Sequence, residues 1–91
     1  MQKLQYKKIE RTVRGFANHR RIEILHLLHT KPELSVVEIA DTLKINFKTA
    51  ADHTQRLAIT GLIMKRNDGP SVRHKLTKQG SGILKFCRTL E

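Results

Sequence analysis

The chain has 91 residues and a mass of 10.5 kDa, which is enough for one compact domain. Its 18 Lys and Arg against 8 Asp and Glu give a net charge of +10, which is typical of proteins that bind polyanions. No apolar run approaches the ~18 residues of a membrane span, and a single cysteine, Cys87, excludes an internal disulfide and an all-cysteine metal cage. We therefore expect one cytoplasmic domain over residues 1–91 that does not bind membranes, and we exclude a secreted disulfide scaffold, a transmembrane protein and a zinc finger.

The basic charge is distributed along the chain and does not form a tail. Residues 1–31 and 44–91 are both strongly basic, whereas the charges in residues 32–43 are all acidic, at Glu33, Glu38 and Asp41. A disordered basic arm would instead show a run of about five or six like charges. The positive charge is therefore expected on the surface of a folded domain.

Two amphipathic helices are predicted in the first 31 residues. The first covers residues 2–16, with apolar side chains three and four positions apart at Tyr6, Ile9, Val13 and Phe16. The second starts after Asn18, a favourable N-cap, and runs to about His29. It ends before Pro32, because the residue that precedes a proline is displaced from helical geometry.

A short third helix and a longer fourth helix follow, separated by a tight turn. The third starts at Ser35, where Glu38 completes a capping box, and lasts about two turns. The tight turn falls at residues 44–45. The fourth helix is capped by Asn46 and ends at Gly61, a residue type that commonly follows a helix C-terminus.

A β-hairpin is predicted after the fourth helix. Its strands cover residues 62–66 and 71–76, and Pro70 after Asp68-Gly69 favours a loop of more than two residues. Alternation in the second strand predicts a basic face opposite a buried face that comprises Val72, His74 and Leu76.

The last predicted helix covers residues 77–90. Within it, Gly80 and Gly82 are expected to mark close backbone packing, because glycine otherwise lowers helix stability. A short helix joined by a tight turn to a second helix is the helix-turn-helix, and a basic hairpin directly after it is a wing. We therefore predict a mainly α winged helix-turn-helix fold with about five helices and a small two-stranded β-hairpin.

The segment from Leu43-Lys44-Ile45-Asn46 to Gly61-Leu62-Ile63 carries a recognisable motif. It resembles the winged helix-turn-helix repressors of the ArsR type, whose pattern is L-G-L-S-Q-S-T-V-S-H-H-L-x-x-L-x-x-A-G-L-V. The two align without a gap, and the identical positions are Leu43, Thr49, His53, Leu57, Gly61 and Leu62. The resemblance extends over residues 18–80, where residues 76–80 are similar to the L-T-x-x-G of MarR- and PadR-like relatives, and it implies a DNA-binding transcriptional regulator.

The family's metal-sensing sites are not matched. Metal-sensing members carry E-L-C-V-C-D-L at the start of the helix-turn-helix, but residues 33–39 here read E-L-S-V-V-E-I, so both cysteines are replaced. Other members bind metal through His and Asp ligands on the terminal helix. Residues 77–91 have no such ligand except Cys87. The resemblance therefore implies a regulator without these metal sites.

In the resembled family, the outward face of the fourth helix enters the major groove of DNA. At 3.6 residues per turn, Lys48, Asp52, Gln55 and Ile59 lie opposite a packing face of Ala50, Thr54 and Leu57. The candidate DNA-contacting residues of the turn and helix are Lys44, Asn46, Lys48, Thr49, Ala51, Asp52, Gln55 and Arg56, and those of the wing are Lys65, Arg66, Arg73 and Lys75. The alternative for the wing is a solvated basic strand pair without a ligand.

Several of these side chains have alternative roles. Lys48 suits a guanine edge or a phosphate, and Gln55 suits adenine. Asp52 could accept from a cytosine amine, but an ion pair with Lys48 or Arg56 on the same helix is favoured. Phe47 is expected to pack against the neighbouring helix in preference to contacting the groove. Ile59 has no assigned partner.

The histidines are interpreted as structural, and no cofactor is predicted. His53 and His74 are expected to be hydrogen-bonded inside the domain. Glu23, His26 and His29 have metal-ligand spacing, but exposed helix faces often show such spacing and a fourth ligand is missing. The sequence has no nucleophile constellation and no glycine-rich phosphate loop, so we expect a protein that is not an enzyme.

The terminal helices, residues 2–16 and 77–90, are expected to form a homodimer, because they are the dimer surfaces in the resembled family. The candidate interface residues are Tyr6, Ile9, Val13, Phe16, Ile83, Phe86, Cys87 and Leu90. Alternatively, the two apolar stripes cover each other within one chain.

The predicted function is sequence-specific binding of double-stranded DNA by a transcriptional regulator, a repressor that acts by site occupancy without an identifiable small-molecule effector. The alternatives are a winged-helix module that binds proteins and a module that binds RNA. The low aromatic content of 4% argues against single-strand binding by base stacking.

Overall fold

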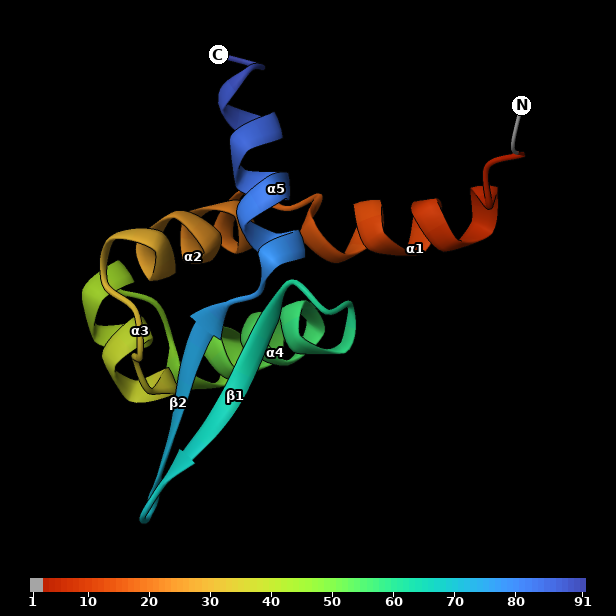
Figure 1. The fold of residues 1–91 in the computed structure, drawn as a ribbon. Helices are drawn as coiled ribbons and strands as arrows, with labels where there is room; N and C mark the ends of the chain where they lie inside the picture. Colours follow the sequence, from red (N-terminus) through yellow and green to blue (C-terminus); the bar gives the residue numbers. More distant parts are fainter. Residues whose placement is uncertain (1–2) are drawn as a thin grey trace.

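The computed structural model describes residues 3–91, which form five helices and one antiparallel two-stranded hairpin (Figure 1). In chain order the elements are α1 (Tyr6–Phe16), α2 (His19–Thr30), α3 (Val36–Leu43), α4 (Phe47–Ile59), β1 (Ile63–Asp68), β2 (Ser71–Leu76) and α5 (Lys78–Arg88). The predicted winged helix-turn-helix fold is thus confirmed, with α3 and α4 as the helix-turn-helix and the hairpin as the wing. None of the helices in this described part of the chain is long and apolar enough to cross a membrane.

The predicted helix N-termini are set by polar caps. Asn18 accepts hydrogen bonds from the backbone N–H groups of Arg20 and Arg21, at 2.9 and 3.2 Å. Ser35 and Glu38 form the predicted reciprocal capping box, and Thr77 accepts from the backbone N–H of Gly80. Each cap satisfies backbone donors that the first helical turn leaves without partners, and this defines where α2, α3 and α5 begin.

Both terminal helices are shorter than predicted. α1 begins at Tyr6, and Gln5 at its N-cap makes no side-chain capping hydrogen bond, so residues 3–5 stay outside the helix. The predicted start at residue 2 lies outside the described residues. α5 ends at Arg88, two residues before the predicted end, where Thr89 and Leu90 turn back to hydrogen-bond Phe86 and Cys87.

One hydrophobic core joins all the helices to the base of the wing. The core consists of Phe16, Ile24, Leu25, Leu28, Ile39, Ala40, Ala50, Leu57, Leu62, Ile63 and Leu84. Phe16 is only 8% exposed, so this chain itself covers most of its side chain, and its predicted contribution to a dimer surface is limited to the edge that stays exposed. Val72 is exposed, against prediction, because β2 extends beyond the core.

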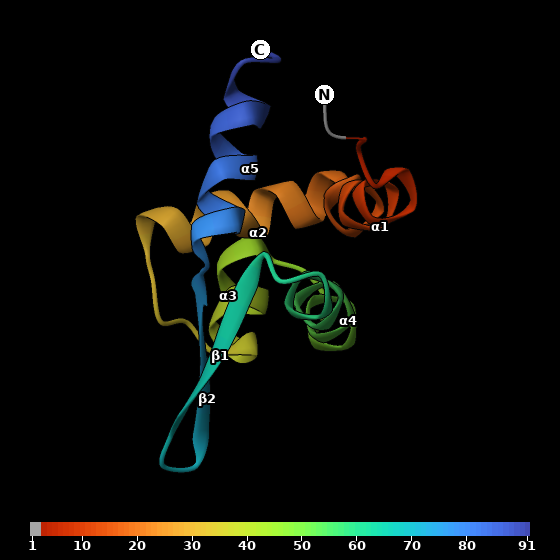
Figure 2. The same ribbon diagram turned by 45° about the vertical axis from the view of Figure 1, so that its right-hand side comes forward.

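The hairpin leaves the core as a long arm (Figures 1 and 2). Its strands pair from Ile63↔Leu76 to Asp68↔Ser71, so the loop contains only Gly69 and Pro70, and the prediction of a longer loop is wrong. Gly69 has φ +61, and proline is acceptable after it because a type II′ turn needs a positive φ only at its first central residue. Beyond Ile63, every residue of β1 is exposed.

α1 and α4 approach each other closely at their C-terminal ends. Gly15 is buried at this crossing, and a Cβ atom there would overlap the side chain of Thr60. Arg21 holds the crossing from α2: it donates to the carbonyls of Arg14 and Gly15, at 3.0 and 3.3 Å, and through Nε to Nδ1 of His53, at 3.1 Å. Arg21 therefore ties α1, α2 and α4 together.

His53 must be neutral to accept this hydrogen bond. Burial lowers the pKa of His53 from the ordinary value of 6.5, and the neighbouring Arg21 lowers it further. Asp52 raises this pKa and Arg56 and His19 lower it, but the net direction is downward. The predicted role of His53 as a hydrogen-bonded structural residue is confirmed.

We predict that acid destabilises the fold through His53. Because folding lowers this pKa, the unfolded chain binds the proton more tightly, so the free energy of unfolding is unaffected at high pH and falls as the pH drops through about 6.5. Urea unfolding from about pH 8 to pH 5 measures this. His53→Gln retains an acceptor but does not titrate, and it should lose part of the pH dependence. Parallel pH curves for the two proteins would contradict the assignment.

The two glycines of α5 differ, against the prediction that both mark close packing. A Cβ atom on Gly80 would overlap the backbone carbonyl oxygen of Leu62, whereas a Cβ on Gly82 would have no atom within 4 Å. Gly80→Ala should therefore lower the free energy of unfolding by about 1–3 kcal/mol through overpacking. Gly82→Ala, the matched control, should raise it by about 1 kcal/mol through helix propensity. Chemical unfolding at a fixed protein concentration tests the pair, and equal effects would contradict it.

Candidate nucleic-acid interface

The outward face of α4 carries polar and charged side chains in the predicted helical phase. Ala50, Thr54 and Leu57 are buried against the domain. The opposite face exposes Lys48, Thr49, Asp52, Gln55 and Arg56, while Ala51 is half-buried at its edge. Donors and acceptors for base edges and phosphates are thus presented together on one exposed helix.

The N-terminus of α4 is fixed by the turn before it. Lys44 adopts the left-handed conformation, with φ 56, at the position where the resembled pattern has glycine. Asn46 then accepts hydrogen bonds from the backbone N–H groups of Lys48 and Thr49, at 2.7 and 3.4 Å. The side-chain oxygen of Asn46 is therefore a helix cap, which limits its predicted contact with DNA to its amide nitrogen. Lys44 is exposed beside it.

Asp52 forms the ion pair that the sequence favoured. Its carboxylate lies 3.5 Å from Nε of Arg56, one turn along α4, and both side chains are exposed. A pair of this length between exposed side chains contributes little to stability. Asp52 therefore reduces the positive charge around Arg56, but this weak pair does not hold the two side chains in one position.

Phe47 and Ile59 project from the two ends of α4. Phe47 is 56% exposed, so the prediction that it packs against the neighbouring helix is wrong. As the first residue of the helix it points away from the core, which the packing face of α4 meets only from Ala50 onward. Ile59 is 73% exposed at the opposite end, beside α1.

The arginines of the wing are paired with acidic side chains. Arg66 and Arg73 lie directly opposite each other in the hairpin, an arrangement that is destabilising for two like charges. Arg66 donates through Nε to the carboxylate of Glu33 at 3.1 Å. Arg73 contacts Asp68 and Glu38, both at 3.2 Å, and donates to the backbone carbonyl of Glu33 at 3.1 Å.

This network joins the wing to the start of α3 and changes the interpretation of the wing arginines. Glu38 takes part in both the capping box of α3 and the contact with Arg73. Hydrogen bonds from the backbone and hydroxyl of Ser35, and then the charge of Arg73, lower the pKa of Glu38. The sequence did not predict these pairs because the partners are far apart along the chain. Glu33 lies 33 positions before Arg66, and Glu38 lies 35 positions before Arg73.

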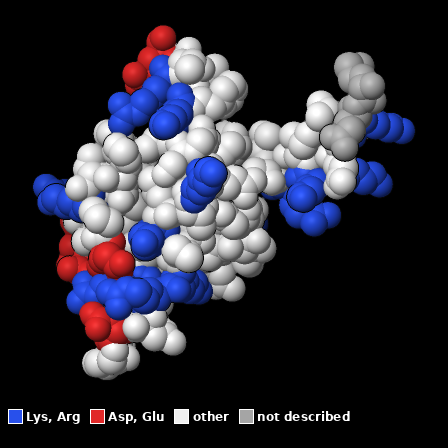
Figure 3. Space-filling model, viewed as in Figure 1, with Lys and Arg blue, Asp and Glu red and all other residues white. Residues whose placement is uncertain are grey.

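The lysines of the wing are differently placed. Lys65 and Lys75 are exposed on β1 and β2, and no carboxylate in residues 3–91 lies within 4 Å of either amine. Figure 3 shows basic and acidic atoms interleaved over the wing and its base, and basic atoms on the projecting α1. Acidic side chains thus neutralise part of the charge of the wing arginines. Lys65 and Lys75 are the wing cations that have no acidic partner among residues 3–91.

His74 holds the root of the wing. It is 1% exposed, its backbone N–H donates to the carbonyl of Leu34, and its Nδ1 lies 2.9 Å from the same oxygen. The backbone N–H of Glu33 in turn donates to the carbonyl of His74 at 2.9 Å. The predicted structural role of His74 is confirmed, and the segment before α3 pairs with the outer side of β2.

Five of the eight predicted dimer residues line a groove between α1 and α5. This groove of about 430 Å³ is bordered by Ile9, Val13, Phe16, Ile83 and Phe86. Tyr6 and Leu90 are exposed beyond it, and Cys87 is half-buried on the other side of α5. The two stripes therefore face one another across the groove but do not cover each other fully.

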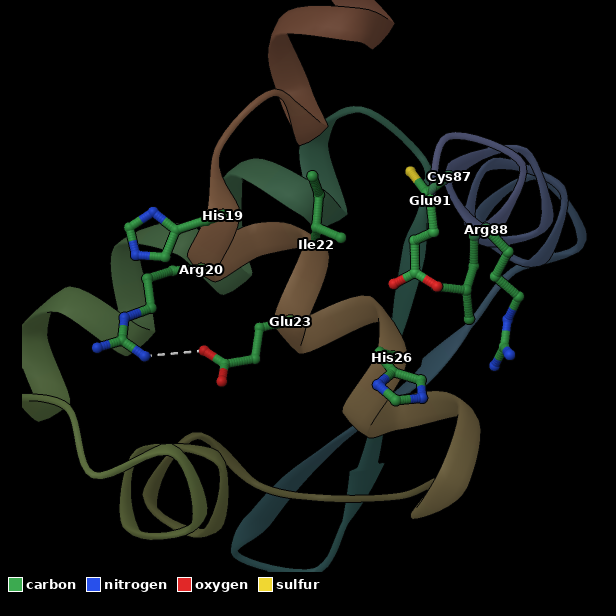
Figure 4. Close-up of a pocket in the computed structure, with 9 residues that line it drawn as sticks. His19, Arg20, Ile22, Glu23, His26, Cys87, Arg88 and Glu91 are labelled. Atoms are coloured by element: carbon green, nitrogen blue, oxygen red, sulfur yellow. Dashed lines mark hydrogen bonds and ion pairs between the residues drawn. The ribbon is translucent and has the colours of Figure 1, made fainter.

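A second hollow, of about 440 Å³, lies between α2 and α5 (Figure 4). Its rim carries Arg20 and Arg88 against Glu23 and Glu91, and Arg20 donates to Glu23 at 2.9 Å. Its charges are thus balanced. Across the whole described range, residues 3–91, no three His, Cys, Asp or Glu side chains gather closely enough to hold a metal ion.

Comparisons with known proteins give matches among solved structures. No family model and no curated protein sequence matches the chain. One match is the solution structure of fragment 1–100 of Mb0332 from Mycobacterium bovis. This fragment is a homodimeric winged helix-turn-helix DNA-binding domain of a possible ArsR-family transcriptional regulator. The TM-score is 0.84 at 24% identity, over 99% of this chain and 87% of that one. Its crystal structure gives 0.82 and 26%, over 93% and 91%.

The transcriptional regulator HlyU from Vibrio vulnificus matches with a TM-score of 0.75 and 28% identity, over 93% of this chain and 88% of that one. These alignments cover 93–99% of this chain, so they include both the helix-turn-helix and the wing. The chain therefore has the winged helix-turn-helix fold and shares its architecture with these structures.

Proposed function

We propose that this protein is a transcriptional regulator that binds double-stranded DNA in a sequence-specific manner and represses by occupying its site. The observation that carries the proposal is the exposed face of α4, where Lys48 and Gln55 point away from the core while the wing extends beside the helix. A helix of this kind fits the major groove, and lysines on a wing contact the phosphate backbone. The regulators of similar structure support the same activity.

We further propose that the protein acts as a homodimer through α1 and α5. The apolar groove between these helices, with exposed Tyr6, Phe86 and Leu90 around it, offers a self-complementary surface. The homodimeric state of the Mycobacterium bovis domain supports this arrangement. A two-fold dimer would place two copies of α4 about 34–36 Å apart, in successive major grooves.

Selection of bound sequences from a random duplex pool tests the proposal. The expected result is a near-palindromic consensus whose half-sites are one helical turn apart. With about six phosphates neutralised per dimer, affinity should fall on the order of 10³-fold between 50 and 200 mM salt. Structured RNA at the same salt is the competitor control. Failure to retain any duplex in a salt-sensitive manner would refute the proposal.

Arg73 and Lys75 are predicted to act differently, although they are neighbours in β2. Lys75→Gln should weaken binding and reduce the slope of log affinity against log salt by about 0.9 for each phosphate that Lys75 neutralises. Arg73→Gln should weaken binding with an unchanged slope, because it releases the wing from Glu38 and from the carbonyl of Glu33 but leaves every phosphate with its cation. Titrations at several salt concentrations measure both. A reduced slope for Arg73→Gln would assign a phosphate to Arg73.

Phe47 is predicted to read a thymine methyl group. It is exposed at the N-terminus of α4, beside Lys48, and apolar side chains there can contact the thymine C5-methyl group. Replacing single thymines of the selected site by deoxyuracil removes this methyl and should weaken wild-type binding at one position per half-site. Phe47→Ala should be insensitive to the same replacement. If both proteins respond equally at every position, Phe47 does not read thymine.

A further inference from the structure

Four arginines from three helices line one small pocket at the crossing of α1 and α4. The pocket has a volume of about 220 Å³, and the arginines among its lining residues are Arg11 and Arg14 of α1, Arg21 of α2 and Arg56 of α4. Ile59 and Thr60 complete its wall. We refer to this site as the arginine pocket.

The framework of the arginine pocket is rigid. Gly15 lets α1 approach Thr60 within contact distance, and Arg21 holds the last carbonyls of α1 through two hydrogen bonds. Figures 1 and 2 both show α1 leaving the body of the domain next to the C-terminal end of α4. The packing of the helices therefore places the backbones of the four arginines around one point, although the side chains of Arg14 and Arg56 are themselves largely exposed.

Internal acids neutralise only part of this charge. Arg14 lies 3.5 Å from Glu10 and Arg56 lies 3.5 Å from Asp52, and all four side chains of these pairs are largely exposed. Within residues 3–91, no carboxylate lies within 4 Å of Arg11 or Arg21. Arg21 instead donates to neutral acceptors, two backbone carbonyls and the ring of His53. The pocket thus keeps a net positive charge, unlike the balanced hollow between α2 and α5.

The donor set matches an anion with several oxygens. Guanidinium groups bind phosphate through paired, charge-assisted hydrogen bonds, and groups that approach from different helices can reach different oxygens of a tetrahedral anion. A carboxylate would offer two oxygens to four guanidiniums. The arginine pocket also adjoins the outward face of α4, because Arg56 and Ile59 belong to both.

We propose that the arginine pocket binds a phosphate group, as a site that adjoins the outward face of α4 at Arg56 and does not include the wing. The phosphate belongs either to the backbone of bound DNA or to a small phosphorylated molecule. The first source rests on the proposed DNA-binding function and would make α1 a second arm that contacts the duplex. The second source is independent of that function.

The test compares two variants of α1 with equal loss of charge. Arg11→Gln with Arg14→Gln removes two guanidiniums from the pocket but leaves the carbonyl that Arg21 binds. Lys7→Gln with Lys3→Gln, just before α1, is the control, because neither lysine lines the pocket or the groove between α1 and α5. Thermal unfolding in chloride alone shows whether each variant folds.

The first measurement titrates inorganic phosphate into the protein without DNA, at constant ionic strength, by calorimetry. Wild type and the lysine variant should bind in a saturable manner, and the arginine variant about tenfold more weakly or not at all. The second measurement is the salt dependence of duplex binding. If DNA supplies the phosphate, the arginine variant has a smaller salt slope than the lysine variant.

Either difference supports the proposal, and the pattern identifies the source of the phosphate. The proposal is overturned if the arginine variant matches the lysine variant both in phosphate binding and in salt slope. Absence of duplex binding by the wild type would refute the proposed function, whereas the phosphate titration would still decide the arginine pocket.

Discussion

The pairing of residues 33–34 with β2 is the constraint on which the arrangement of this domain depends. Hydrogen bonds between Glu33, Leu34 and His74 fix the root of the wing to the segment that starts α3, and α3 in turn sets the turn before α4. Arg66 and Arg73 extend this attachment to the side chains of Glu33 and Glu38. The angle between wing and helix is therefore determined by buried backbone pairing and reinforced by exposed ion pairs.

This attachment separates two kinds of basic residue that look alike in the sequence. Lys48, Lys65 and Lys75 carry charge into solvent, where a polyanion can meet it. The wing arginines hold protein groups in position, and Arg21 does the same at the other end of the domain. The count of 18 Lys and Arg consequently overstates the number of cations that the surface leaves free of protein partners.

Local features of the structure could be predicted from the sequence, and contacts between distant segments could not. The caps at Asn18, Ser35 and Asn46 and the buried face of α4 follow from short-range spacing, so they were predicted correctly. The partners of Arg73 and the crowding at Gly80 depend on segments far along the chain, and the exposure of Phe47 depends on where the core ends. The arginine pocket could not be found either, because its side chains come from three helices.

The hairpin has few buried side chains beyond its base, so its rigidity decreases from the base to the tip. Ile63 and His74 anchor one end of the hairpin in the core, while the remainder of β1 has no apolar side chain buried beneath it. Segments with few buried contacts open at a lower free energy than the core does. The tip of the hairpin, beyond the ion pairs of Arg66 and Arg73, can consequently flex to follow grooves of different width in the proposed complex with DNA, while α4 keeps its place.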